Sequence, residues 1–159
     1  MNIDVIAVGG IKEKYLREAL KEYLKRLGAY ADVNIKEIDE YKLGNDPAQA
    51  EIDKGMEKEG QAIIGQIKPR SYVIALCVEG KQFSSEDFSA RIEEAMVDGY
   101  SDIAFVIGGS FGLSQDVKKL ADLKLSFSKM TFPHQLMRVV LLEQVYRAFR
   151  IMRNEPYHK

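Results

Sequence analysis

Three short runs of apolar residues constrain the fold of this chain more than any other feature. They cover residues 3–8, 72–78 and 103–107, and none of them alternates regularly between apolar and polar side chains. A strand that is apolar on both faces is typical of a parallel sheet with helices on both sides. Residues 33–38 do alternate, which predicts a half-buried strand at or near the sheet edge. We expect the run 72–78 to lie centrally in the sheet.

Helical patterns separate these strands. Apolar residues recur at spacings of three and four over residues 15–27, and again from Pro133 to about Arg153. Serine caps predict two more helices, one after Ser84 and a short one over residues 114–121. A helix over residues 48–66 is expected to be short or mobile, because interior glycines and a sparse apolar face weaken it. Alternating strands and helices predict an α/β fold with a mostly parallel sheet covered by helices.

A glycine-rich segment follows the strand 103–107 and opens a helix. It reads Ile107-Gly-Gly-Ser-Phe-Gly-Leu-Ser114, and its glycines would let a ligand approach the backbone closely. It matches neither the dinucleotide nor the P-loop fingerprint, so a structural turn is the alternative interpretation. Parallel sheets bind ligands beyond the carboxyl ends of their strands. That edge would bring together residues 76–81, 108–113 and 127–132, the last of which follow a brief strand over residues 123–127.

The C-terminal part of the chain is basic. Residues 117–159 hold nine Lys/Arg and three Asp/Glu, so they carry +6 against −7 for residues 1–116. Arginines interleaved with aromatic residues can bind phosphate and stack on bases. A solvated helix face explains the charges equally well, and ordinary packing explains Tyr146 and Phe149. The terminal pair Tyr157-His158 is different, because nothing in a tail compels an aromatic residue and a histidine there.

Composition excludes several other classes of protein. With 46% hydrophobic and 30% charged residues, the chain is not disordered, and 159 residues suit a single domain over residues 1–159. One cysteine and two histidines offer no metal-ligand spacing, so no metal is expected. Cys77 is expected to be a buried strand thiol. No apolar run approaches a membrane span and the N-terminus has no export signal, which predicts a cytoplasmic protein with no membrane contact.

Further ordered motifs follow the glycine-rich segment. They are Leu125-Ser-Phe-Ser-Lys-Met-Thr-Phe-Pro-His134, then Arg138-Val139 and Glu143-Gln-Val-Tyr-Arg-Ala148, and finally Asn154-Glu-Pro-Tyr-His-Lys159. In this order and at this chain length they resemble the ribosomal large-subunit methyltransferase H family, a group of small SPOUT-class enzymes. The opening segment over residues 3–10 fits as well, so the resemblance covers essentially the whole chain.

The resemblance implies a C-terminal trefoil knot, a homodimer and S-adenosylmethionine bound in the knot. It also implies the reaction, which is N3 methylation of a pseudouridine in 23S ribosomal RNA on the assembled ribosome. None of this follows from periodicity, which alone would favour an unknotted sheet. The family's cofactor positions carry over to the following residues: Leu76, Gly108, Phe127, Ser128, Lys129, Met130, Thr131 and Phe132.

The same resemblance makes Arg147, Tyr157 and His158 the candidate catalytic residues. A uracil-type base loses its N3 proton only well above neutral pH, so a cation that stabilises the anion or a group that takes the proton would help. Arg147 suits charge stabilisation and RNA contact, and His158 suits proton acceptance or base positioning. Which subunit supplies the tail to each site stays open.

Two other functions are compatible with parts of the sequence. A noncatalytic ribosome-binding factor could use the basic C-terminal helix alone. A nucleotide-binding oxidoreductase is disfavoured by the missing dinucleotide fingerprint. The loop before the last helix also has a structural interpretation, in which Thr131 caps that helix and His134 packs or caps near its start.

Overall fold

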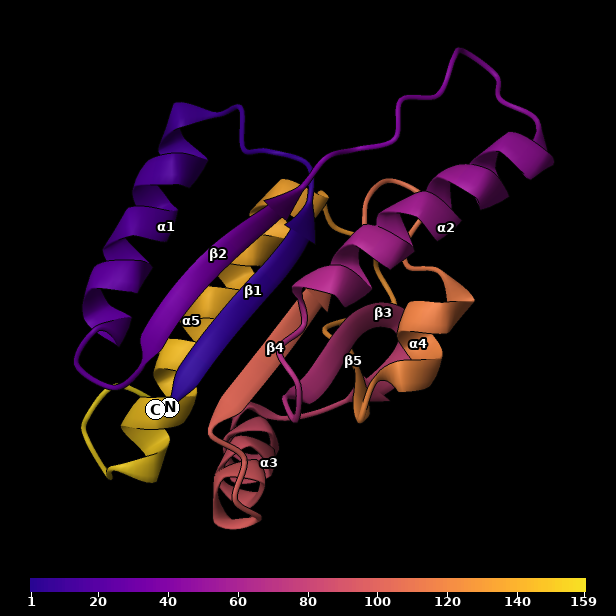
Figure 1. Ribbon diagram of the computed structural model, residues 1–159. Helices are drawn as coiled ribbons and strands as arrows, with labels where there is room; N and C mark the ends of the chain where they lie inside the picture. Colours follow the sequence, from indigo (N-terminus) through magenta and orange to yellow (C-terminus); the bar gives the residue numbers. More distant parts are fainter.

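A five-stranded, all-parallel sheet lies between two layers of helices in the computed structural model, which describes all 159 residues (Figure 1). The strands are arranged in the order β2-β1-β4-β3-β5. The predicted α/β class is therefore confirmed. In chain order the elements are β1 (Asn2–Val8), α1 (Lys14–Leu27), β2 (Asp32–Ile38), α2 (Gln49–Gln66), β3 (Tyr72–Gln82), α3 (Ser85–Val97), β4 (Asp102–Ile107), α4 (Gln115–Leu120), β5 (Leu123–Ser126) and α5 (His134–Met152).

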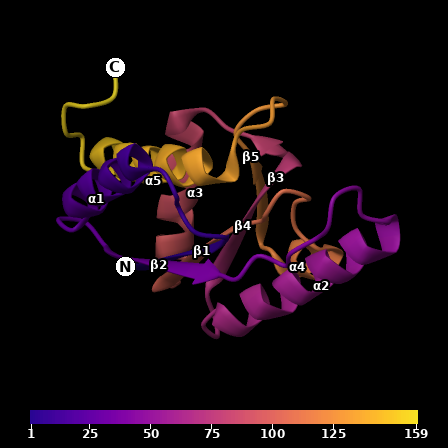
Figure 2. The same cartoon turned by 90° about the horizontal axis from the view of Figure 1, so that it is seen from above.

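Both faces of the sheet are buried, as the apolar runs predicted. Successive side chains of a strand point to opposite faces, so Ile3 and Val5 pack toward one layer of helices while Ile6 and Val8 pack toward the other. Helices α1, α3 and α5 cover the first face, and α2 and α4 cover the second (Figure 2). No helix is long and apolar enough to cross a membrane.

The third strand differs from its prediction in position and length. Strand β4 occupies the middle of the sheet, and β3 lies between β4 and the edge strand β5. The strand also continues past Val78 to Gln82, with an irregularity in its pairing, because Leu76 and Lys81 both pair with Leu125. Gly80 permits this path, since a Cβ there would lie 2.8 Å from the backbone of Lys124 and Leu125. The predicted edge position of β2 is confirmed.

Helix α2 is a continuous helix of 18 residues, so the expectation of a short helix was wrong. Its glycines are sites of close packing. A Cβ on Gly55 would lie 2.7 Å from the Tyr41 ring, and a Cβ on Gly60 would lie 2.2 Å from the Ser114 hydroxyl. Tertiary contacts of this kind outweigh the low helix propensity of glycine.

The predicted serine caps are present. The Ser84 and Ser114 hydroxyls accept hydrogen bonds from the backbone N–H groups of Asp87 and Val117, at the starts of α3 and α4. Helix α5 begins at His134, after Pro133, and its first turn has no side-chain cap. The alternative role of Thr131 as its cap is therefore wrong.

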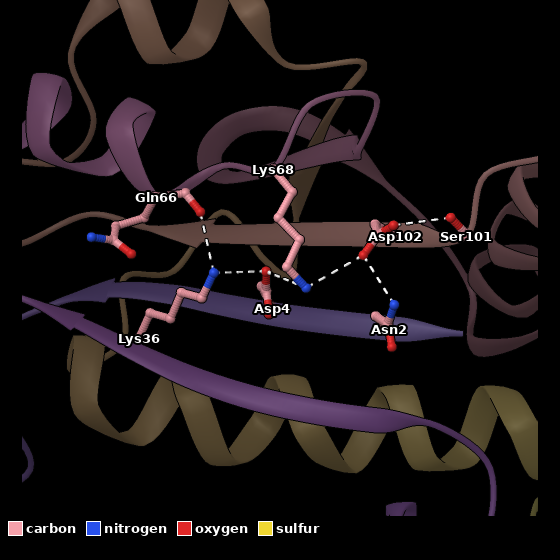
Figure 3. A network of polar contacts seen from close by, with 7 residues as sticks. All are labelled: Asn2, Asp4, Lys36, Gln66, Lys68, Ser101 and Asp102. Atoms are coloured by element: carbon pink, nitrogen blue, oxygen red, sulfur yellow. Dashed lines mark hydrogen bonds and ion pairs between the residues drawn. The ribbon is translucent and has the colours of Figure 1, made fainter.

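A buried carboxylate pairs with two lysines on the α2 side of the sheet. Asp4 in β1 is 3% exposed. Its Oδ2 atom accepts a hydrogen bond from Lys36 Nζ at 2.9 Å and lies 3.5 Å from Lys68 Nζ (Figure 3). Lys68 also contacts Asp102 Oδ1 at 3.4 Å, while Asp4 Oδ1 is buried without a partner. Two ammonium groups thus compensate one carboxylate that water barely reaches.

We expect Asp4→Asn to lower the free energy of unfolding by about 1–3 kcal/mol, because the two lysines would lose the charge they share. The lysines are partly exposed, which keeps the effect below that of a fully buried pair. Urea unfolding measures the change. Glu93→Gln, on the exposed face of α3, is the control and should change stability by less than about 0.5 kcal/mol. An equally small effect of Asp4→Asn would show that this pair contributes nothing.

Candidate active site

A cleft of about 410 Å³ lies at the carboxyl edge of the sheet, as expected for parallel strands. The ends of β3, β4 and β5 and the first turn of α5 form its walls, so the three loops predicted to converge there do so. Half of its lining residues are hydrophobic. The lining comprises residues 76–79, 107–113, 125–128 and 130–134, together with Lys118 and Met137.

Seven of the eight predicted cofactor residues line this cleft. Lys129 is the exception and is exposed beside it. Hydrogen bonds order the loop after β5: the Ser126 hydroxyl donates to the Ser128 carbonyl, and the Ser128 hydroxyl accepts from the Met130 N–H. The seven residues in the cleft are Leu76, Gly108, Phe127, Ser128, Met130, Thr131 and Phe132.

The glycine-rich segment after β4 folds back on itself to form one wall of the cleft. Gly109 and Gly112 form an isolated antiparallel bridge, and Gly112 has φ +88°, a conformation that other residues rarely adopt. A Cβ on Gly108 would lie 2.6 Å from the carbonyl carbon of Gly112. The wall of the cleft therefore depends on glycine at these positions. The segment is a structural turn, as one interpretation of the sequence had it, and the same turn lines the cleft.

The residues of the cleft fit S-adenosylmethionine. Leu76, Ile107 and Leu125 provide apolar surface for an adenine ring, and the glycine segment leaves backbone groups free of side-chain cover. A mixture of an apolar floor and a few polar groups is typical of cofactor sites of this volume. No group of three or more His, Cys, Asp or Glu side chains is arranged to hold a metal ion.

Sequence reasoning placed residues 76–81 at this edge but expected the strand to end at residue 78, whereas the irregular part of β3 continues through them. Cys77, Val78 and Glu79 line the cleft there, and Glu79 forms an ion pair with Lys118 of α4. The hydrogen bond from Lys118 lowers the pKa of Glu79. Cys77 is half-buried rather than buried, and its partial burial raises the pKa of its thiol. Gly80, two residues after the apolar run ends at Val78, was the available signal, because a strand glycine often marks such an irregularity.

The three candidate catalytic residues meet in a cluster of their own near the C-terminus. The Arg147 guanidinium donates to Glu143 at 2.6 Å and lies over the Tyr157 ring, 4.7 Å from its centroid. The Tyr157 hydroxyl donates to Glu143 at 2.9 Å. The His158 ring lies between Arg147 Nη1 at 3.2 Å and Glu86 Oε1 at 2.7 Å. The sequence thus identified residues that belong together, and Glu143 is the acceptor at their centre.

This cluster does not reach the cleft of the same chain. His134 and Met137 line the cleft in the first turn of α5, and Arg147 follows ten residues after Met137 on the same helix. A helix rises 1.5 Å per residue, so about 15 Å separates Met137 from Arg147 along its axis. The predicted cofactor residues and the predicted catalytic residues therefore lie in two separate regions of one chain.

A second group of contacts fixes the tail on the body of the domain. Arg150 pairs with Glu155 and donates to the Pro156 carbonyl at 3.0 Å, and the Tyr30 hydroxyl donates to Glu155. Phe149 is 4% exposed in the core, which confirms the packing interpretation for that residue. The tail is thus held in a defined path.

We expect the Tyr157 phenol to titrate with a pKa of about 12, above the ordinary 10.0, because burial and the bond to Glu143 favour its neutral form. A raised pKa means that its contribution to stability is present below pH 10 and is lost as the pH rises toward 12. Glu143→Gln should lower this pKa. Carbon-13 NMR of the tyrosine ring carbons follows the titration, with Tyr157→Phe assigning the signal. An unchanged pKa in Glu143→Gln would contradict the proposed cause.

The sequence matches known proteins along its whole length. A family model described as "Predicted SPOUT methyltransferase" matches residues 1–158, so the chain belongs to the SPOUT methyltransferase family. Relatives named "Ribosomal RNA large subunit methyltransferase H" are 52% identical in Carboxydothermus hydrogenoformans and 54% identical in Exiguobacterium sp.. "Ribosomal RNA large subunit methyltransferase H 1" of Clostridium perfringens is 57% identical. Each alignment spans 159 residues and 100% of both chains, which confirms the resemblance seen in the motifs.

A solved structure shares the fold. "The structure of a probable methylase family protein from Haemophilus influenzae Rd KW20" matches with a TM-score of 0.57 at 11% identity, covering 99% of this chain and 70% of that chain. Together with membership in the SPOUT family, this likeness gives the chain the knotted α/β fold. The knot that the resemblance implied is therefore supported, against the general rarity of knots.

Proposed function

We propose that this protein is an S-adenosylmethionine-dependent methyltransferase that methylates N3 of a pseudouridine in 23S ribosomal RNA on the assembled ribosome. The observation that carries the proposal is the cleft, because seven of the eight residues expected from the family resemblance to bind the cofactor line it. The full-length relatives named for large-subunit ribosomal RNA methylation support the substrate. Such an enzyme acts where ribosomes are, in the cytoplasm.

The cleft residues would hold the cofactor by its two ends. Leu76 and the segment over residues 127–132 would enclose the adenosine, and the glycine-rich segment would lie along the rest. The bound sulfonium supplies a methyl group that is electrophilic without help from a metal. The protein must therefore place the base nitrogen in line with that methyl group and exclude water around it.

The C-terminal cluster would act on the base and the RNA. Arg147 is held by Glu143 and lies over the Tyr157 ring, and its guanidinium would stabilise the anionic base. His158 would accept the N3 proton or position the base. Because about 15 Å along α5 separates this cluster from the cleft within one chain, a homodimer in which the tail of one subunit completes the cleft of the other would explain both sets of residues.

Methyl transfer from labelled S-adenosylmethionine to ribosomes that lack the modification tests the proposal. We expect label on one pseudouridine of the large-subunit RNA and little label on free RNA, because a small domain reads mainly the shape of its site. Gly108→Arg should abolish transfer. Tight ribosome binding without label would instead favour a noncatalytic factor that uses the basic C-terminal helix.

A heterodimer tests the shared site. One subunit carries a deletion of the last residues, and the other carries Gly108→Arg in its cleft, so each alone is inactive. In the mixed dimer one intact cleft meets one intact tail from the other subunit, so one of the two sites works and the dimer should show about half the activity of the unaltered dimer. No recovered activity would argue that cleft and tail must belong to one chain.

A further inference from the structure

A second cavity of about 450 Å³ adjoins the cofactor cleft. Ser110 and Phe111, in the glycine-rich segment after β4, line both spaces. The far wall of the second cavity is helix α2 and the chain that leads from β2 into it. A group bound in this cavity would therefore lie next to the molecule in the cleft. Only the glycine-rich segment would lie between the two.

The polar groups of this cavity favour a ligand that donates hydrogen bonds. Glu40 and Glu59 provide carboxylate oxygens, and Lys42 is the one cation in the lining. Two carboxylates against one ammonium disfavour a phosphate. Tyr41 and Phe111 add aromatic surface, and Phe111 is 51% exposed. Aromatic faces beside hydrogen-bond acceptors are typical of sites for an unstacked nucleobase with ring N–H groups.

Glu59 is the acceptor that the fold places most firmly. Its Oε2 atom accepts the Tyr41 backbone N–H at 2.9 Å, which fixes the carboxylate against the chain entering α2. The carboxylate packs against the glycine-rich segment, with Oε1 3.5 Å and Oε2 3.7 Å from the position a Cβ would take on Gly109. Burial raises the pKa of Glu59, as expected for a carboxylate partly withdrawn from water. One oxygen is thus bonded to the backbone, and Oε1 of this cavity-lining residue is available to accept a hydrogen bond from a group in the cavity.

We propose that this second cavity receives the target base and that Glu59 Oε1 accepts its N1–H, so that Glu59 selects pseudouridine over uridine. The inference rests on the proposed function. In pseudouridine the sugar is joined to C5, which leaves N1–H as a free donor, whereas N1 of uridine carries the sugar. N1 and N3 flank the same carbonyl carbon, so a base held at N1 keeps N3 free for methylation. The N1 proton stays on the base, and Glu59 takes no part in the transfer itself.

Glu59→Gln tests this role without removing the structural bond, because the amide oxygen of glutamine can still accept the Tyr41 N–H. Two substrates are compared, ribosomes with pseudouridine and ribosomes with uridine at the target position, the latter from cells that lack the pseudouridine synthase. A site built to accept an N–H rejects a base that lacks it. We expect Glu59→Gln to lower kcat/KM about tenfold or more on pseudouridine ribosomes and to leave the rate on uridine ribosomes within about twofold.

Glu57→Gln is the matched control, because it removes an exposed carboxylate from the same helix outside the cavity. It should leave both rates unchanged, and calorimetry should give the same S-adenosylmethionine affinity for all three proteins. An equal loss on both substrates would show that Glu59 is only structural and would overturn the inference, as would no loss on either. Absence of methyl transfer by the unaltered protein would refute the proposed function itself, and this inference with it.

Discussion

Gly108→Ala should weaken S-adenosylmethionine binding by about 100-fold, which corresponds to roughly 2.7 kcal/mol. The added Cβ would lie 2.6 Å from the carbonyl carbon and 2.7 Å from the carbonyl oxygen of Gly112. These are backbone atoms, so no side-chain rotation relieves the contact. The segment must open, and the bridge between Gly109 and Gly112 that shapes the wall of the cleft would be lost. Isothermal titration calorimetry with S-adenosylmethionine measures the effect directly.

Gly65→Ala provides the control for this substitution. Gly65 lies in α2, and a Cβ there would meet nothing within 4 Å. The control should keep full cofactor affinity. Because alanine has a higher helix propensity than glycine, it should also gain up to about 1 kcal/mol of stability. If Gly108→Ala bound the cofactor as tightly as this control, the glycine-rich segment would not be the surface against which the cofactor lies.

Arg138→Met should lower the free energy of unfolding by about 2–4 kcal/mol. Arg138 is 1% exposed, although it projects from α5 into the edge of the sheet. Its guanidinium donates to the Val8 carbonyl at 3.2 Å and to the Gly9 carbonyl, and it pairs with Glu37 at 3.1 Å. Methionine fills much of the space but leaves both carbonyl groups without their donor. Urea unfolding followed by circular dichroism measures the loss.

Two further variants define what Arg138 contributes. Arg138→Lys should recover only part of the stability, because one ammonium cannot reach three acceptors in the geometry of a guanidinium fork. Arg91→Met on the surface of α3, where Arg91 pairs with Glu94, should change stability by less than about 0.5 kcal/mol. If Arg138→Met lowered the free energy of unfolding as little as Arg91→Met, the buried polar contacts of Arg138 would contribute no more to stability than apolar packing at the same position.

The places where sequence reasoning was wrong share a physical cause. Gly55 and Gly60 weaken α2 by helix propensity, yet each allows another segment to approach the helix closely. The run 72–78 is apolar enough for the middle of a sheet, but the sheet order puts β4 there. Val78 marks the end of the apolar run, whereas pairing with β5 carries the strand on to Gln82. Each of these outcomes depends on a neighbour that is distant in sequence.

The sequence by itself determined the alternation of strands and helices, the serine caps and the parallel sheet, because these depend on local periodicity and on apolar character at both faces. It also indicated the cleft, since parallel strands present their following loops at one edge. Only the tertiary structure decided that Arg138 is buried, that Glu59 lines a second cavity, and that the cluster around Arg147 lies outside the cleft of its own chain. These features depend on which distant segments meet, and residue periodicity carries no information about that.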